Sequence, residues 1–294
     1  MYAHRTFSNP LKRENSKVAT DTTRSRVNVF DHSGKEFLLN LDRAERAEFY
    51  RLLDEAPWEG PTASGHWQVR DLCGHMIDVT EGYLERFGMA RAGQEAPAAL
   101  GLPIMASMLD EAAQSFRSLS KEQAITRLKT ASDKMFQIFD ALDDKQWSGE
   151  IVAHKYMGPL PACFYAGFQL IDYSIHSWDI KSGLGRNEPL SDDAAITLIP
   201  FMLIVIQYTV DAERAKGFKA KFGIEIEGPG GGSWAVDVDG TTVNIAEGST
   251  EGCETVFDFD PNDFVLSTYQ RKRGGTPRGN LELAERVRDL LFKI

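Results

Sequence analysis

The sequence has few cysteines, no long apolar run and no excess of positive charge, and each shortage excludes a class of protein. Cys73, Cys163 and Cys253 are too few and too scattered for a disulfide framework or a zinc ribbon. The longest apolar run, residues 194–206, is shorter than the roughly 18 residues that a membrane span needs, and Pro200 interrupts it. The formal net charge of −10 argues against general binding of nucleic acids or anionic membranes.

What remains is the composition of an ordinary globular protein, since 42% of the 294 residues are hydrophobic and 26% are charged. This length fits two domains or one large domain. We expect a cytoplasmic protein with a small-molecule substrate, which acts as a monomer or a homodimer and has no nucleic-acid or membrane partner. The N-terminal stretch is polar and rich in Ser and Thr, so we expect residues 1–40 to form a flexible extension.

The first two thirds of the chain has the apolar periodicity of amphipathic helices. Helices are predicted at residues 42–54, 69–91, 104–119, 121–142, 162–183 and 191–214. Ser120 and Gln123 have the spacing of a capping box, and Gly183 is suited to end a helix. The pattern predicts a helical domain over residues 41–215.

The pattern changes after Gly217, where apolar and polar residues begin to alternate as they do in strands. Strands are predicted at residues 222–227, 234–238, 241–245 and 253–259, followed by helices at residues 261–273 and 281–293. Asp239-Gly240 is a strong hairpin signal, and the glycine-rich stretch after Pro229 is a turn because it lacks the lysine and helix of a phosphate loop. The fold class is therefore α+β, with a smaller second domain over residues 216–294.

Two helical segments share one pattern of acids and histidine. Asp71, His75 and Asp78 form the first copy, and Asp172, His176 and Asp179 form the second, each with spacing i, i+4 and i+7. This spacing places the three side chains of a copy on one stripe of a helix. Two such helices facing each other would bring together two histidines and up to four carboxylates, which are ligands of a divalent transition metal.

The same residues also have a purely structural interpretation. A histidine on an apolar helix face is more often a satisfied core residue than a ligand. Asp71 suits the first turn of a helix because of the helix dipole, and Asp179 could be a solvated or salt-bridged helix end. In the metal interpretation, Asp78 and Asp179 would instead accept hydrogen bonds from the imidazole N–H groups.

Other residues are weaker candidates for a functional site. Cys73 lies two residues from His75 and should point elsewhere, into the core. His154 lies before the second motif helix and could border a pocket. Arg271, Lys272 and Arg273 form a basic cluster with Arg278, which we interpret as a solvated helix end in preference to an anion-binding edge.

The two histidine motifs also carry a family resemblance. Trp67-x-Val-Arg-Asp-Leu-x-Gly-His75 and Asp172-x3-His176-Ser-Trp-Asp-Ile, followed by Gly183, resemble the signatures of DinB-like four-helix bundles. The chain is most similar to the mycothiol-dependent maleylpyruvate isomerase family, whose members join such a bundle to a small α+β domain similar to sterol carrier proteins. The stretch from Arg278 to Arg286 and the change of pattern near Gly217 fit this similarity, which extends over roughly residues 40–294.

The resemblance implies a divalent metal, usually zinc, held by His75, Asp172 and His176. The middle ligand in the family is often Glu or His, so Asp172 is a shorter replacement. Three protein ligands leave an open position, which in this family a low-molecular-weight thiol such as mycothiol is thought to occupy. The implied reaction is isomerisation or S-transfer on a small electrophile, with carboxylates among the candidate substrates.

Two other functions stay open from the sequence. The second domain could carry an apolar ligand such as a lipid in a non-catalytic protein, and the shortened ligand at Asp172 favours this slightly. Alternatively, a metal-bound water could act as the nucleophile of a hydrolase, because hydrolysis needs the same open metal position.

Overall fold

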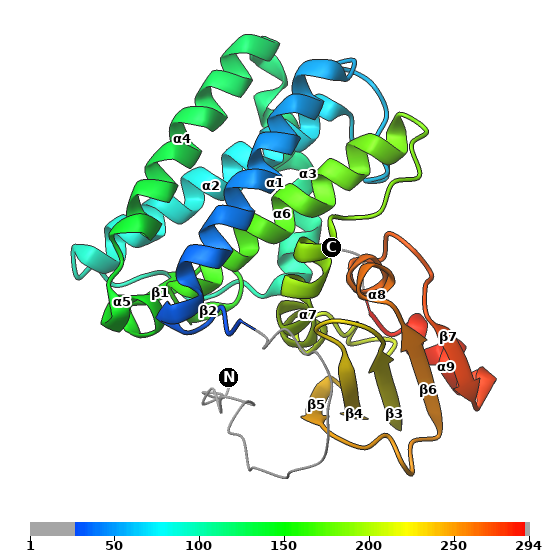
Figure 1. Cartoon of the computed structure of the whole chain (residues 1–294). Coiled ribbons are helices and arrows are strands. Elements are labelled where there is room, and N and C mark those ends of the chain that lie inside the picture. The colour runs from blue at the N-terminus through cyan, green and yellow to red at the C-terminus, as the bar shows by residue number, and fades with distance from the viewer. Residues whose placement is uncertain (1–26, 292–294) are drawn as a thin grey trace.

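Four long helices form the first domain of the computed structural model, which describes residues 27–291 (Figure 1). They are α1 (Lys35–Glu55), α2 (Val69–Arg91), α4 (Lys121–Ala141) and α6 (Cys163–Gly183). Helix α1 packs against α6 and α2 packs against α4, while α3 (Leu102–Gln114) lies along α2. The predicted helical bundle is confirmed.

Local signals explain where these helices begin. Gln68 and Asp71 form a reciprocal capping box at the start of α2, and Ser120 and Gln123 form the predicted one at the start of α4. Helix α6 is buried on almost every side, because α1, α2 and α7 (Asp192–Ile206) all pack against it. Helix α6 is therefore the centre of the bundle.

The expected N-terminal extension is too long. A short 3₁₀ turn, η1 (His32–Gly34), precedes α1, and α1 begins at Lys35 instead of after residue 40. Leu38 and Leu39 are 0% and 2% exposed, so burial of these two side chains holds this turn in the helix. Residues 1–26 of the expected extension lie outside the described residues.

A small hairpin lies between two helices of the bundle, where we predicted neither strand. After α5 (Asp144–Gly149), β1 (Ile151–His154) pairs antiparallel with β2 (Gly158–Pro161). Val152 and Leu160 face each other and are both 0% exposed, so core burial stabilises strands that are too short to show a clear alternation. Gly158 has φ of +86°, a conformation that favours glycine at the start of β2.

Helix α7, which contains Pro200, leads from the bundle into the second domain. It corresponds to the longest apolar run and is largely buried. Among the described helices, none is both long enough and apolar enough to cross a membrane.

The second domain is a mixed five-stranded sheet with two helices. Its strands are β3 (Lys219–Ile226), β4 (Gly232–Asp239), β5 (Thr242–Glu247), β6 (Thr255–Phe259) and β7 (Thr276–Gly279). Their order is β5-β4-β3-β6-β7, and only the β3–β6 pair is parallel. The parallel pair needs a crossover, and residues 248–254 supply it, because β5 ends level with the end of β3 while β6 starts opposite Phe222. This arrangement confirms the α+β fold class.

The sequence-based prediction of this domain erred after β6. Helix α8 (Pro261–Thr268) ends five residues earlier than expected, because Gln270 takes a left-handed conformation with φ of 55°. Edge strand β7 was missed because it contains Pro277, which is tolerated only at a sheet edge. Helix α9 (Leu281–Arg288) begins where expected but ends at Arg288, and residues 292 and 293 of the predicted helix lie outside the described residues.

Close packing of α2 on α3 predicts that Gly74→Ala destabilises the protein. A Cβ atom at Gly74 would lie inside van der Waals contact of the Ala113 carbonyl oxygen, so the change should lower the free energy of unfolding by about 1–3 kcal/mol. Gly88 lies on the same helix with nothing within 4 Å of such an atom. The control Gly88→Ala should therefore raise stability by roughly 0.5–1 kcal/mol. Urea unfolding of both variants measures the difference, and equal effects would contradict this packing.

Candidate metal centre

Three predicted ligand residues come together between two helices of the bundle. His75 lies on α2, and Asp172 and His176 lie one turn apart on α6. One ligand-type atom from each side chain lies within 4.8 Å of the others, and the two imidazole rings are 5.0 Å apart, edge to face. Tetrahedral zinc with bonds of about 2.1 Å holds its ligand atoms about 3.4 Å apart. The group is therefore slightly wider than a loaded zinc site, and it could hold a metal ion.

Burial sets the charge state of this group. Desolvation, together with His176 and Arg271, lowers the pKa of His75 well below its usual value, so this imidazole is neutral, the form that binds metals. Burial raises the pKa of Asp172 to about 6, although His176 partly opposes the shift. Asp172 is half-buried beside two imidazoles, and a bound cation would favour its ionised form.

Asp179 holds one of these imidazoles in place. Its Oδ2 lies 3.0 Å from Nδ1 of His176, an arrangement typical of metal-bound histidines and their carboxylate partners. This contact leaves Nε2 of His176 to face a metal. The predicted role of Asp179 as a partner of a site histidine therefore agrees with the geometry.

Arg271 reaches the same carboxylate from the second domain. Its Nε and Nη2 donate to Asp179 at 2.7 and 3.0 Å, and Nη2 also donates to Ser64 Oγ at 3.2 Å. The Arg271 side chain is 2% exposed and that of Asp179 is 0% exposed. Burial alone would raise the pKa of Asp179, but the hydrogen bond to His176 and the guanidinium charge hold this pKa below its usual value.

The other acids of the two motifs do not join the group. Asp71 accepts the backbone N–H of Gln68 and two hydrogen bonds of 2.7 Å from Arg117, so its structural interpretation is the right one. Asp78 lines the pocket beside the triad, and burial raises its pKa. The motifs thus supply one carboxylate of ligand type, Asp172, and one supporting carboxylate, Asp179.

The triad opens into a pocket of about 580 Å³ between the bundle, the β1–β2 hairpin and the segment after α8. His154 lines this pocket, as its place before the second motif helix suggested. His66 lies at the rim, where its Nε2 is 2.6 Å from Asp110. Cys73 is buried in the core, as expected.

Arg271 is the site residue that the sequence did not identify. We expected the whole basic cluster to be a solvated helix end, and for Arg271 this is wrong. Because α8 stops at Thr268 and the chain reverses at Gln270, Arg271 points into the bundle. The other members pair with acids at the surface, as Lys272 does with Asp263. No local pattern distinguishes Arg271 from its neighbours.

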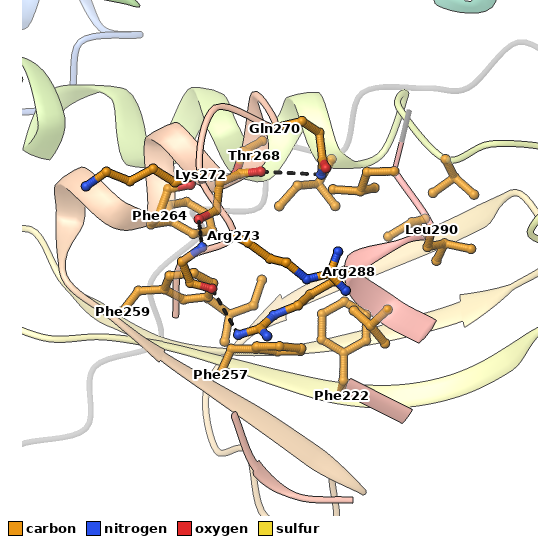
Figure 2. A pocket seen from close by; sticks show the side chains of 18 of the residues that line it. Phe222, Phe257, Phe259, Phe264, Thr268, Gln270, Lys272, Arg273, Arg288 and Leu290 are labelled. Carbon is orange, nitrogen blue, oxygen red and sulfur yellow. Dashed lines mark hydrogen bonds between the residues drawn. The ribbon is translucent and has the colours of Figure 1, made fainter. Parts of the chain in front are cut away.

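A second cavity, of about 270 Å³, lies inside the sheet domain (Figure 2). Aromatic and aliphatic side chains form most of its wall, among them Phe222, Phe257 and Phe264, while Arg273 and Arg288 also line it. Arg288 pairs with Glu285, and Arg273 pairs with both Glu285 and Asp289, so two acids compensate these two cations. The cavity suits a small apolar molecule.

Comparison with known proteins identifies the family of the helical domain. Residues 40–181 match the model of the mycothiol maleylpyruvate isomerase N-terminal domain. The helical domain of this chain belongs to that family. This assignment confirms the resemblance carried by the two histidine motifs.

Solved structures extend the likeness to both domains. The crystal structure of the mycothiol-dependent maleylpyruvate isomerase superposes with a TM-score of 0.58 at 16% identity, covering 83% of this chain and 92% of that one. A mutant of that enzyme, with a histidine replaced by alanine, matches over the same shares with a TM-score of 0.58 at 15% identity. At these identities the likeness establishes the fold. No curated protein sequence matches the chain.

The buried contact between the domains predicts that Asp179→Ala is strongly destabilising. It would leave the Arg271 guanidinium buried without this carboxylate, which typically costs about 3–5 kcal/mol in the free energy of unfolding. Asp140 pairs with Arg43 at the surface, where the side chains are 53% and 40% exposed, so the control Asp140→Ala should cost less than about 1 kcal/mol. Urea unfolding measures both, and a loss at Asp179 no larger than the control would contradict the assigned contact.

Proposed function

We propose that this protein is a metal-dependent enzyme that uses a low-molecular-weight thiol to isomerise a small electrophile or to transfer sulfur to it. The observation that carries the proposal is the convergence of His75, Asp172 and His176 at a 580 Å³ pocket. Two imidazoles and one carboxylate are a common donor set for catalytic zinc. Three protein ligands leave a coordination position free for a reactant.

The residues present fit such a metal. When bound there, zinc would lower the pKa of a thiol and so supply a thiolate at neutral pH. The chain's own contribution is to orient the donors. Asp179 fixes the ring of His176, and the Trp67 ring lies 5.3 Å from the His75 ring and covers it. Arg271 lines the pocket and holds Asp179 in place.

The pocket is large enough for two reactants. A volume of 580 Å³ lies in the range of ordinary small-molecule sites, so a thiol and a small electrophile can share it. Mycothiol as the thiol and maleylpyruvate as the electrophile rest on family analogy, which does not fix a substrate. A related electrophile fits the same argument.

The cavity in the sheet domain favours a second candidate function, binding of an apolar small molecule. Its wall is largely aromatic and aliphatic and includes no residue of the triad, so it could bind a ligand without any metal. If the purified protein contains bound lipid and does not bind added metal, the carrier function is favoured over catalysis.

Metal analysis of His176→Ala beside the unchanged protein tests the proposal. We expect close to one divalent metal per chain after reconstitution with zinc, and a loss of at least about tenfold in zinc affinity in His176→Ala. His66 lies at the pocket rim outside the triad, so the control His66→Ala should keep its metal.

Thiol dependence separates the remaining alternatives. In the cobalt-loaded protein, an added thiol should produce a sulfur-to-metal absorption band, and turnover of an electrophile should require that thiol. Ester hydrolysis with metal but without thiol would replace the proposal with the hydrolase. Unchanged protein that binds no metal would refute both enzymatic functions.

A further inference from the structure

Arg86 is a cation without an acidic partner in the 580 Å³ pocket into which the triad opens. It lies on α2 and lines the pocket, yet among residues 27–291 no carboxylate lies within ion-pair distance of its guanidinium. Its Nη1 is buried and finds no hydrogen-bond acceptor there. A buried donor without an acceptor costs free energy, so an incoming anion would gain by supplying one.

The sequence around Arg86 explains why its guanidinium has no acidic partner on the same helix. On a helix, side chains three or four positions away are its neighbours, and these are Gly82, Tyr83, Met89 and Ala90, none of them acidic. Glu81, an acid that also lines the pocket, pairs with another cation, Arg127, at 2.7 Å. Lys155 is the cation that lowers the pKa of Asp78, although burial outweighs it. The positive charge of Arg86 therefore remains available to a ligand.

His154 supplies a neutral donor at the same end of the pocket. Its Nδ1 accepts hydrogen bonds from the backbone N–H groups of Tyr156 and Met157, at 3.3 and 3.1 Å. The ring proton must then lie on Nε2, so His154 is a neutral imidazole with one N–H to donate. Burial, and then the charge of Arg86, lowers the pKa of His154 to about 4, which keeps this state at neutral pH.

The spacing along α2 sets the distance of this pair from the metal group. Arg86 follows His75 by eleven positions, or about 16 Å along the helix axis at a rise of 1.5 Å per residue. The side chains of His75 and Arg86 both lean back toward the N-terminus, and the arginine is longer, so its guanidinium lies roughly 10–15 Å from the triad. A ligand that touches both ends must therefore be elongated.

From these observations we infer that Arg86 and His154 form an anion subsite that binds a carboxylate carried by one of the two reactants, roughly 10–15 Å from the metal group. The guanidinium gives charge and two parallel donors, and the His154 Nε2–H gives a third. The inference rests on the proposed function for the other end of the ligand. The carboxylate belongs either to the thiol or to the electrophile.

Binding of matched thiols to the cobalt-loaded chain tests the subsite. The probes are straight-chain ω-mercaptocarboxylates of increasing length and the ω-mercaptoalcohols of equal length, read by the sulfur-to-cobalt band. The acid should bind tighter than the alcohol by roughly tenfold to a hundredfold once the chain spans the distance. Arg86→Gln should abolish this preference, and Arg86→Lys should keep part of it. Arg91→Gln is the matched control, because Arg91 lies on the same helix but pairs with Glu150 outside the pocket lining.

Untethered probes identify which reactant carries the carboxylate. A straight-chain carboxylate is titrated calorimetrically into the metal-free chain, and into the cobalt-loaded chain with mercaptoethanol present. Arg86-dependent binding there assigns the anion to the electrophile, whereas binding only of the tethered acid assigns it to the thiol. If the chain takes up no cobalt, the metal-free titration still decides the subsite, separately from the proposed function. An acid preference that is absent, or unchanged in Arg86→Gln, would overturn the inference.

Discussion

A single buried carboxylate connects the two domains at the candidate centre. Asp179 bonds to the imidazole of His176 on one side and to the guanidinium of Arg271 on the other. A fully buried acid is stable only if such partners compensate its desolvation. The position of the sheet domain on the bundle and the orientation of one ligand-type histidine therefore depend on the same side chain.

Helix α6 has an unusual sequence, because it carries this carboxylate and other polar side chains although most of the helix is buried. The helix is buried on almost every side, yet Asp172, His176 and Asp179 follow one stripe of it. Burying the polar side chains of His176 and Asp179 is costly unless each has a partner, and Asp179 has two. Asp172 has the raised pKa of an acid that still lacks a cation. Its short side chain suits two helices close enough to bring the imidazole rings within 5.0 Å.

Much of this arrangement could be predicted from the sequence, for identifiable reasons. Helix α2 and helix α6 follow from long periodic patterns, and the repeated acid–histidine spacing predicted that His75, Asp172 and His176 meet. That they bind a metal stays a prediction. The same spacing was misleading for Asp71, because capping a helix and binding a metal favour the same residue type.

The missed features all depend on tertiary contacts. Strand β7 and the β1–β2 hairpin are short segments that core burial and sheet pairing stabilise against weak local preferences. Arg271 reaches Asp179 beside the triad because the chain reverses after α8. Arg86 differs from Arg127 because no carboxylate pairs with it among residues 27–291. Such features become visible only when segments far apart in the sequence lie side by side.

X-ray absorption at the zinc edge tests the central claim, that the triad is a metal centre with one position open to a thiol. The zinc-loaded chain should show only nitrogen and oxygen neighbours at about 2.0–2.2 Å. Addition of a thiol should introduce one sulfur neighbour at about 2.3 Å. A zinc environment that already contains sulfur, or one that the thiol leaves unchanged, would contradict the account.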